Sequence, residues 1–146
     1  MTQKSTHIVS IILLIVISGF SCINKEKQKR VIDEQIAQFG YPQIKFDTTY
    51  YDFGKMIQGE SAAYTFKFEN TGKADLLILD AFSTCGCTVP DYSKEPIAPG
   101  EEGKVEVVFN SAGKSGMQYK TVTLKLNTEI EKKTLTIKAD VIVENV

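Results

Sequence analysis

The sequence contains no tryptophan and only one histidine, four prolines and three cysteines among 146 residues. It also lacks an excess of either charge, because 17 basic and 18 acidic residues give a formal net charge of −1. A protein that binds nucleic acid through its surface charge carries a basic patch or stripe, whereas the basic residues here are scattered, so we expect no nucleic-acid partner. The hydrophobic content of 42% is ordinary for one globular domain.

The single histidine, His7, lies ahead of the only long apolar run of the chain. A form of the protein that is processed before Cys22 therefore has no imidazole for a catalytic dyad or for metal binding. This absence removes most hydrolase mechanisms. We predict a protein that is not an enzyme and has no cofactor.

Residues 1–21 have the layout of a secretory signal peptide: a short polar start, an apolar run over residues 8–17 and small residues before Cys22. A helix that spans a bilayer needs about 20 apolar residues, and the charges that begin at Lys25 stop this run. The segment Gly19-Phe20-Ser21-Cys22 resembles the lipobox of bacterial lipoproteins, in which the signal is cut before a cysteine that receives a diacylglycerol.

The lipobox resemblance implies that Cys22 is lipidated and anchors an exported protein to the cell envelope of a Gram-negative bacterium, on the periplasmic side or at the cell surface. Two or three acyl chains would hold it firmly, since each buried methylene adds about 0.8 kcal/mol. The alternatives are an uncleaved anchor and an ordinary signal peptide followed by an incidental cysteine. In each case the domain is exported.

Residues 22–43 form a spacer that is rich in Lys, Glu and Gln. Ile32, Ile36 and Phe39 have helical spacing, which predicts a short amphipathic helix from Val31 to Phe39 that ends before Gly40. A disordered tether is the alternative, because the segment is highly charged. Its basic start is suited to anionic head groups.

From residue 44 to residue 146 apolar and polar residues alternate, which is typical of half-buried strands. Ala62, Tyr64 and Phe66 share one face of such a strand, for example. The near-continuous apolar stretch Leu76 to Phe82 predicts a strand that is covered on both sides or central in its sheet, and the prolines from Pro90 onward predict an irregular loop. We predict an all-β fold, an immunoglobulin-like antiparallel β-sandwich of about seven strands.

Six segments of this domain resemble, in order, the motifs of a bacterial family of exported lipoproteins of unknown function, which is similar to Hydin-like and major-sperm-protein-like immunoglobulin modules. The resemblance covers about residues 44–142 and implies a fold and a compartment, but no activity. The segments are Asp52-Phe53-Gly54, Gly59-Glu60, Phe66-Lys67-Phe68-Glu69-Asn70-Thr71-Gly72, Thr84-Cys85-Gly86-Cys87-Thr88, Ile97-Ala98-Pro99-Gly100-Glu101 and Lys120-Thr121-Val122-Thr123-Leu124.

Cys85 and Cys87 are the candidate disulfide or thiol site. Residues two apart in a strand point the same way, and Gly86 lets the chain bend so that the thiols face each other. A disulfide between them closes a very small ring, which stores strain and makes the bond easier to reduce. The alternatives are thiol exchange with a partner and a strand-end disulfide or buried thiol pair without chemistry.

A metal site needs further ligands beside these two thiols. Closed zinc sites take four ligands, and with Cys22 lipidated only carboxylates such as Asp80 or Asp91 remain, so we expect no zinc. Copper(I) is held by soft ligands, and Met117 is the candidate third ligand if the fold brings it near.

These observations lead to two hypotheses about function. The first is a non-enzymatic, lipid-anchored interaction module that contacts an unidentified protein or envelope partner through exposed strand edges and loops. The second is a thiol-redox or soft-metal protein that acts through Cys85 and Cys87. Five tyrosines are either an aromatic binding patch or part of the sandwich itself: Tyr41, Tyr50, Tyr51, Tyr92 and Tyr119.

Overall fold

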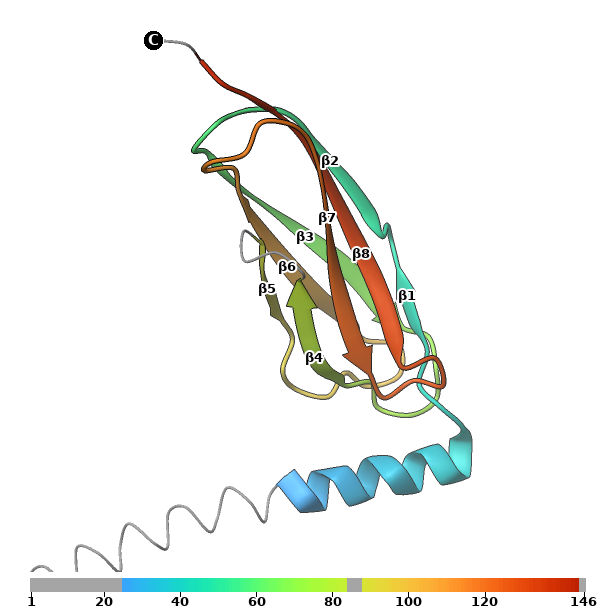
Figure 1. Cartoon of the computed structure of the whole chain (residues 1–146). Coiled ribbons are helices and arrows are strands. Elements are labelled where there is room, and N and C mark those ends of the chain that lie inside the picture. Colours follow the sequence, from blue (N-terminus) through green and yellow to red (C-terminus); the bar gives the residue numbers. More distant parts are fainter. Residues whose placement is uncertain (1–24, 84–87, 145–146) are drawn as a thin grey trace, which may run out of the picture.

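Two stacked β-sheets form the body of the protein, and a helix lies across one end of them (Figure 1). The computed structural model describes residues 25–83 and 88–144. Its eight strands are β1 (Ile44–Phe46), β2 (Tyr50–Ile57), β3 (Ser61–Asn70), β4 (Ile78–Ser83), β5 (Thr88–Tyr92), β6 (Glu102–Asn110), β7 (Gly116–Leu126) and β8 (Lys132–Ile142).

Sheet A has the strand order β1-β3-β6-β5, and sheet B has the order β2-β8-β7-β4. The chain changes sheets between β1 and β2, so that β1 pairs with β3 while β2 pairs with β8. The β2–β8 pair is parallel, and the other pairs within the two sheets are antiparallel. Two packed sheets of this kind are the immunoglobulin-like architecture, which confirms the predicted fold class.

The core lies between the sheets and is built from the alternating residues of β3, β6, β7 and β8, as their sequences predict. Phe66, Val107 and Leu124 are 0% exposed. Tyr51 and Tyr64 join the two sheets by a stacked contact with 3.6 Å between the ring centroids. Burial of each large apolar side chain contributes about 1.5–3 kcal/mol to folding.

The prediction for the stretch from Leu76 to Phe82 is wrong in one respect. The stretch contains β4, but β4 is an edge strand of sheet B and is not covered on both sides. Leu79 is 50% exposed and Phe82 is 46% exposed, while Leu76 and Ile78 are buried. Leu79 lies at an irregularity of the β4–β7 pairing and lines a hollow beside the helix, so part of this apolar stretch serves the helix and not the sheet.

The prediction of a loop from Pro90 onward is wrong at its start, because Pro90 lies in strand β5, opposite Val107 of β6. Proline has no N–H to give to a ladder and is found in edge strands. β5 is the edge of sheet A, which explains why the proline is tolerated there. The described residues therefore form eight strands, in agreement with the predicted number of about seven.

The described part of the N-terminal helix covers residues 25–39, so the helix is the correct alternative for this part of the spacer and begins before Val31. Its Ile32 is 4% exposed and packs against the end of the sandwich. Gln35 accepts a 2.9 Å hydrogen bond from the Asp75 backbone N–H and donates one of 3.3 Å to the Asp75 carboxylate. In the described part of the chain, no helix is long and apolar enough to cross a membrane.

Candidate functional site

Three of the four predicted site residues lie outside the part of the chain that the structure describes. These are Cys22, Cys85 and Cys87. Their lipidation, disulfide, thiol and copper interpretations therefore stay predictions. Met117, the proposed third copper ligand, lies near the start of β7 and is 50% exposed.

β4, the strand that leads to the cysteines, runs antiparallel to β7 and ends before it reaches Met117, with its direction toward the Met117 end of β7. Ser83, the last residue of β4, pairs with Val122, which lies five residues beyond Met117 along β7. At about 3.4 Å per residue this separation is about 17 Å. Within residues 25–83 and 88–144, no three His, Cys, Asp or Glu side chains group closely enough to hold a metal ion.

The free edge of sheet B at β2 is closed by side chains. Where the backbone N–H and C=O groups of a β2 residue are not hydrogen-bonded to β8, they point away from β8 toward the open edge of the sheet. An additional strand would bind at these groups. At Tyr50 the Thr48 hydroxyl fills this place, since it accepts from the backbone N–H at 3.2 Å and donates to the carbonyl at 2.8 Å. At Ile57 the Glu60 carboxylate accepts from the backbone N–H at 2.8 Å.

The edges at β4 and β5 are also poor templates for a further strand. On β4 the Asp80 carboxylate accepts a 2.8 Å hydrogen bond from the Ala81 backbone N–H, and the pairing of this strand is irregular. On β5 the backbone lacks a donor at Pro90. Strand edges that are capped in this way resist pairing with another chain, so these three edges do not favour the edge contacts of our first hypothesis.

The outer faces of the two sheets differ sharply in chemistry. The outer face of sheet A is charged, and its cross-strand neighbours include Lys45 opposite Glu69 and Lys67 opposite Lys104. Seven of its exposed side chains carry a charge, namely Lys45, Lys67, Glu69, Asp91, Glu102, Lys104 and Glu106. Among the side chains described for the strands of sheet A, no large apolar one is exposed.

The outer face of sheet B also carries seven charged side chains, but large apolar and aromatic side chains and a group of threonines lie among them. The charged ones are Asp52, Lys55, Asp80, Lys125, Lys132, Lys138 and Asp140. Tyr119 is 60% exposed and Met117 is 50% exposed. Thr121 of β7 lies opposite Thr136 of β8, and Thr123 lies opposite Thr134. The large exposed members of this outer face are Tyr50, Ile57, Phe82, Met117, Tyr119 and Ile142.

An ion pair connects β2 and β8 on the outer face of sheet B. The Lys138 Nζ atom donates a 2.7 Å hydrogen bond to the Asp52 carboxylate, and the other oxygen of Asp52 accepts from the Gly54 backbone N–H at 2.8 Å. The bond from Lys138, followed by the bond from Gly54, lowers the pKa of Asp52. The same bond from Asp52 raises the pKa of Lys138, so both groups stay charged and the pair is neutral.

The five tyrosines do not form one patch. Tyr51 is part of the core through its stack on Tyr64, and the ring of Tyr92 lies 3.2 Å below the Lys94 ammonium group. Tyr50 and Tyr119 lie on the outer face of sheet B, on the two strands that flank β8. The aromatic patch is therefore made of two of the five residues.

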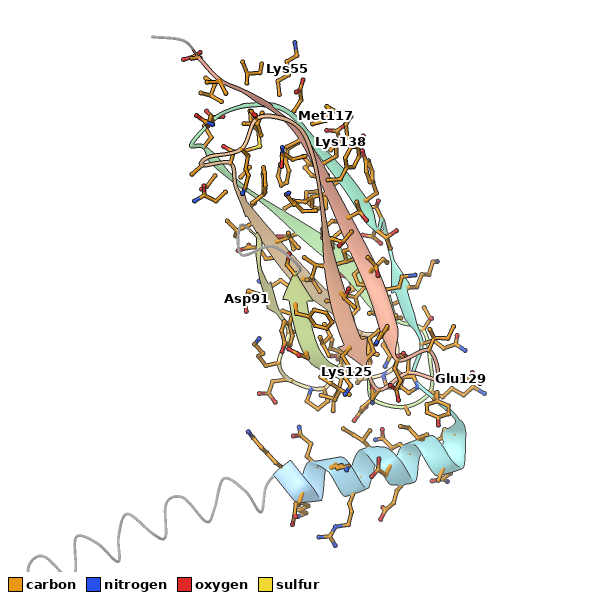
Figure 2. The ribbon with its side chains drawn as sticks, in the orientation of Figure 1. Lys55, Asp91, Met117, Lys125, Glu129 and Lys138 are labelled. Atoms are coloured by element: carbon orange, nitrogen blue, oxygen red, sulfur yellow. The ribbon has the colours of Figure 1, made fainter. Side chains whose placement is uncertain are left out.

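Figure 2 shows that Met117 and Lys138 lie toward the same end of sheet B, whereas Lys125 lies near the other end of β7, close to the helix. The sequence did not indicate Met117 and Tyr119 as neighbours of Lys138, because the strand register is needed to place them. The sequence signal for this surface was the alternation of Met117, Tyr119, Thr121 and Thr123 along one segment, at positions where other predicted strands carry charged residues.

Residues 44–141 match the family model described as "Protein of unknown function (DUF1573)". The chain belongs to the DUF1573 family. The match covers the whole sandwich of this DUF1573 protein apart from the last residue of β8. The description of the family names no enzymatic activity. None of the curated proteins matches the chain in sequence.

Several solved structures share the fold of the DUF1573 domain. A protein of unknown function from Porphyromonas gingivalis W83 has a TM-score of 0.60 and 15% identity, over 68% of this chain and 46% of its own. PapD-like domain 7 of human CEP192 has a TM-score of 0.55 and 11% identity, over 72% of this chain and 89% of its own.

The VesB protease of Vibrio cholerae has a TM-score of 0.55 and 19% identity, over 67% of this chain and 32% of its own. The chain thus spans less than half of the Porphyromonas protein and about a third of the protease. At these identities the likeness shows the fold alone. It is an immunoglobulin-like and PapD-like sandwich.

Proposed function

We propose that this protein is a non-enzymatic, lipid-anchored interaction module of the bacterial cell envelope, and that it binds its partner through the outer face of sheet B. The anchor is the acylated Cys22 that the lipobox resemblance implies. The helix over residues 25–39 then connects this anchor to the sandwich. The edge contacts of the first hypothesis are replaced by contacts of a sheet face.

The contrast between the two outer faces is the observation that carries this proposal. Monomeric proteins rarely expose large contiguous apolar patches, and such patches mark sites of interaction. Interfaces are enriched in Tyr, Phe and Met. Both outer faces carry charged side chains, but the exposed Tyr, Phe and Met side chains of the described strands lie on the outer face of sheet B and none lies on that of sheet A. The family description, which names no enzymatic activity, is consistent with this role.

The binding part of the proposal is tested by capturing the full chain, after chemical crosslinking, from envelopes of the host bacterium. The double variant Tyr50→Ser/Tyr119→Ser removes two aromatic side chains from the sheet B face. We expect at least tenfold less captured partner, since aromatic residues at the centre of an interface often contribute 2 kcal/mol or more. The matched control, Lys67→Ser/Glu69→Ser on sheet A, should capture as much as the natural protein. Equal loss in both variants, or in neither, would refute a sheet B interface.

The anchoring part is tested separately by the intact mass of the protein extracted from membranes. The natural chain should begin at Cys22 and carry the mass of two or three acyl chains, whereas Cys22→Ala should be found in the soluble fraction without them. A membrane-bound Cys22→Ala protein that retains residues 1–21 would instead indicate an uncleaved anchor.

A further inference from the structure

We propose that the partner on the outer face of sheet B is a second copy of this chain, packed face to face. This inference rests on the proposed function and names its partner. Two sheets that pack face to face keep their strands within about 30° of each other and lie about 10 Å apart. In a dimer with a two-fold axis, the same surface of each copy forms the interface. This surface must therefore be complementary to itself in shape and charge.

The charges on this face suit a second copy. Asp52 is neutralised by Lys138 at 2.7 Å, and Lys55 lies beside Asp140 across the β2–β8 pair. Because these four charges are paired within one chain, the part of the face that carries them meets its copy without the like-charge repulsion that opposes a wrong partner. On sheet A, like charges lie directly opposite each other at two positions, Lys67 with Lys104 and Glu69 with Glu102. On sheet B the like-charge pair is Lys125 with Lys132, at the helix end of the face (Figure 2).

The position of the helix selects the direction of the two-fold axis. The helix lies at one end of the sandwich (Figure 1), and Cys22 precedes its first described residue by three positions, a reach of about 10 Å. Two copies that are anchored in one bilayer therefore have their helix ends on the same side. An axis parallel to the strands meets this condition, whereas an axis across the strands places the helices at opposite ends.

An axis parallel to the strands and between β7 and β8 lays β7 of one copy over β8 of the other. Tyr119 lies opposite Lys138 within one chain, so each Tyr119 then faces the Lys138 of the second copy, which is the geometry of a cation–π contact. Likewise Thr121 faces Thr136 of the second copy, and their hydroxyl groups can exchange hydrogen bonds. Strands that cross at about 30° diverge at their ends, which leaves Lys125 and Lys132 in water.

The area of the face predicts a weak pair. Four strands spaced by about 4.8 Å and seven residues spaced by about 3.4 Å give a face of about 19 by 24 Å, or about 460 Å². A standard interface buries roughly 800 Å² per partner. Two chains held on one membrane have a raised effective concentration. We therefore expect the pair on the membrane and not in dilute solution.

The test is photo-crosslinking of the full chain in its host membrane, with a benzophenone amino acid in place of Tyr119 and, as the matched control, in place of Lys67 on sheet A. We expect a product of twice the mass from position 119, identified by mass spectrometry as two copies of this chain, and none from position 67. Products from position 119 that contain only another protein would overturn the second copy but leave the proposed function standing. No product from position 119, or equal products from both, would overturn both.

A charge variant gives a second readout that does not depend on the probe at position 119. In Tyr119→Lys an ammonium group faces Lys138 of the second copy, so crosslinking between copies from a probe at Thr121 should fall at least tenfold. The melting temperature of the purified variant controls for folding. Unchanged crosslinking in a folded variant would contradict the face-to-face pair.

Discussion

At the scale of single residues, Asn70 has the largest hydrogen-bonding load of the buried polar residues in the described chain. It is 0% exposed, and its side-chain amide donates to the carbonyls of Ala74 and Ile97 at 2.8 Å each while its oxygen accepts from the Gly72 N–H at 3.0 Å. Asn70 thus joins the turn after β3 to the loop before β6.

Replacement of Asn70 by alanine should lower the free energy of unfolding by about 2–4 kcal/mol, because each buried backbone group that loses its partner costs about 1–3 kcal/mol. The control is Asn110→Ala. Asn110 is exposed and its side chain accepts one bond from Ala112, so a loss of about 1 kcal/mol or less is expected. Urea unfolding of both variants checks this, and equal losses would contradict the role of Asn70.

The ion pair of the sheet B face makes a prediction about pH. Because the folded state lowers the pKa of Asp52, the stabilisation from this carboxylate is present above its unfolded pKa of about 3.9 and is lost as the pH falls through the lower folded value. Lys138, whose pKa is raised, contributes fully below about pH 10.4 and loses its contribution as the pH rises through the folded pKa.

We therefore expect Asp52→Asn to be less stable than the natural protein at neutral pH, and the difference to shrink as the pH falls well below about 3.9. Urea unfolding as a function of pH measures both proteins. High salt should reduce the difference as well, because the pair is partly exposed. A difference that is the same at every acid pH would show that the hydrogen-bond geometry and not the charge is responsible.

At the scale of secondary-structure elements, the helix over residues 25–39 is held mainly by one apolar side chain and one pair of hydrogen bonds. Ile32 is 4% exposed, whereas its neighbour Val31 is 45% exposed. Removal of a buried isoleucine side chain costs about 2–5 kcal/mol, so Ile32→Ala should release the helix, and amide hydrogen exchange over residues 25–39 should rise more than tenfold.

The strands of the sandwich should keep their exchange rates in Ile32→Ala, because the helix packs against one end of the sandwich only. Val31→Ala is the matched control and should leave the helix in place. If the two variants exchange alike, the helix is not held through Ile32. A release of the helix would loosen the orientation of the sandwich relative to the membrane that we propose.

The sequence predicted those strands in which apolar and polar residues alternate because one face is buried and the other is exposed. It failed where a neighbouring element covers residues that the strand pattern alone would leave exposed. β3, β6, β7 and β8 follow their apolar pattern. β4 does not, because Leu77 and Leu79 line the hollow beside the helix, which local periodicity cannot reveal. β5 was missed because Pro90 indicates a loop unless the strand is known to be an edge.

At the scale of the whole molecule, the candidate surface could not be predicted from the sequence because it depends on the register of four strands. Tyr50, Phe82 and Tyr119 are far apart in the chain, and only the strand order β2-β8-β7-β4 and its register put them on one face. The hydrogen bonds that close the edge at β2 also need the folded backbone. By contrast, the compartment depends on residues 1–22 and was inferred from the sequence alone.

The most direct test of the sheet B interface is hydroxyl-radical footprinting of the full chain in native envelopes, compared with the purified protein at low density in lipid vesicles. Met117 and Tyr119 on the face, and Tyr41 outside it, are 50%, 60% and 51% exposed, and methionine sulfur is readily oxidised. We predict that Met117 and Tyr119 are oxidised several-fold more slowly in the envelope while Tyr41 reacts equally in both samples. Equal oxidation of Met117 and Tyr119 in both samples would contradict the account.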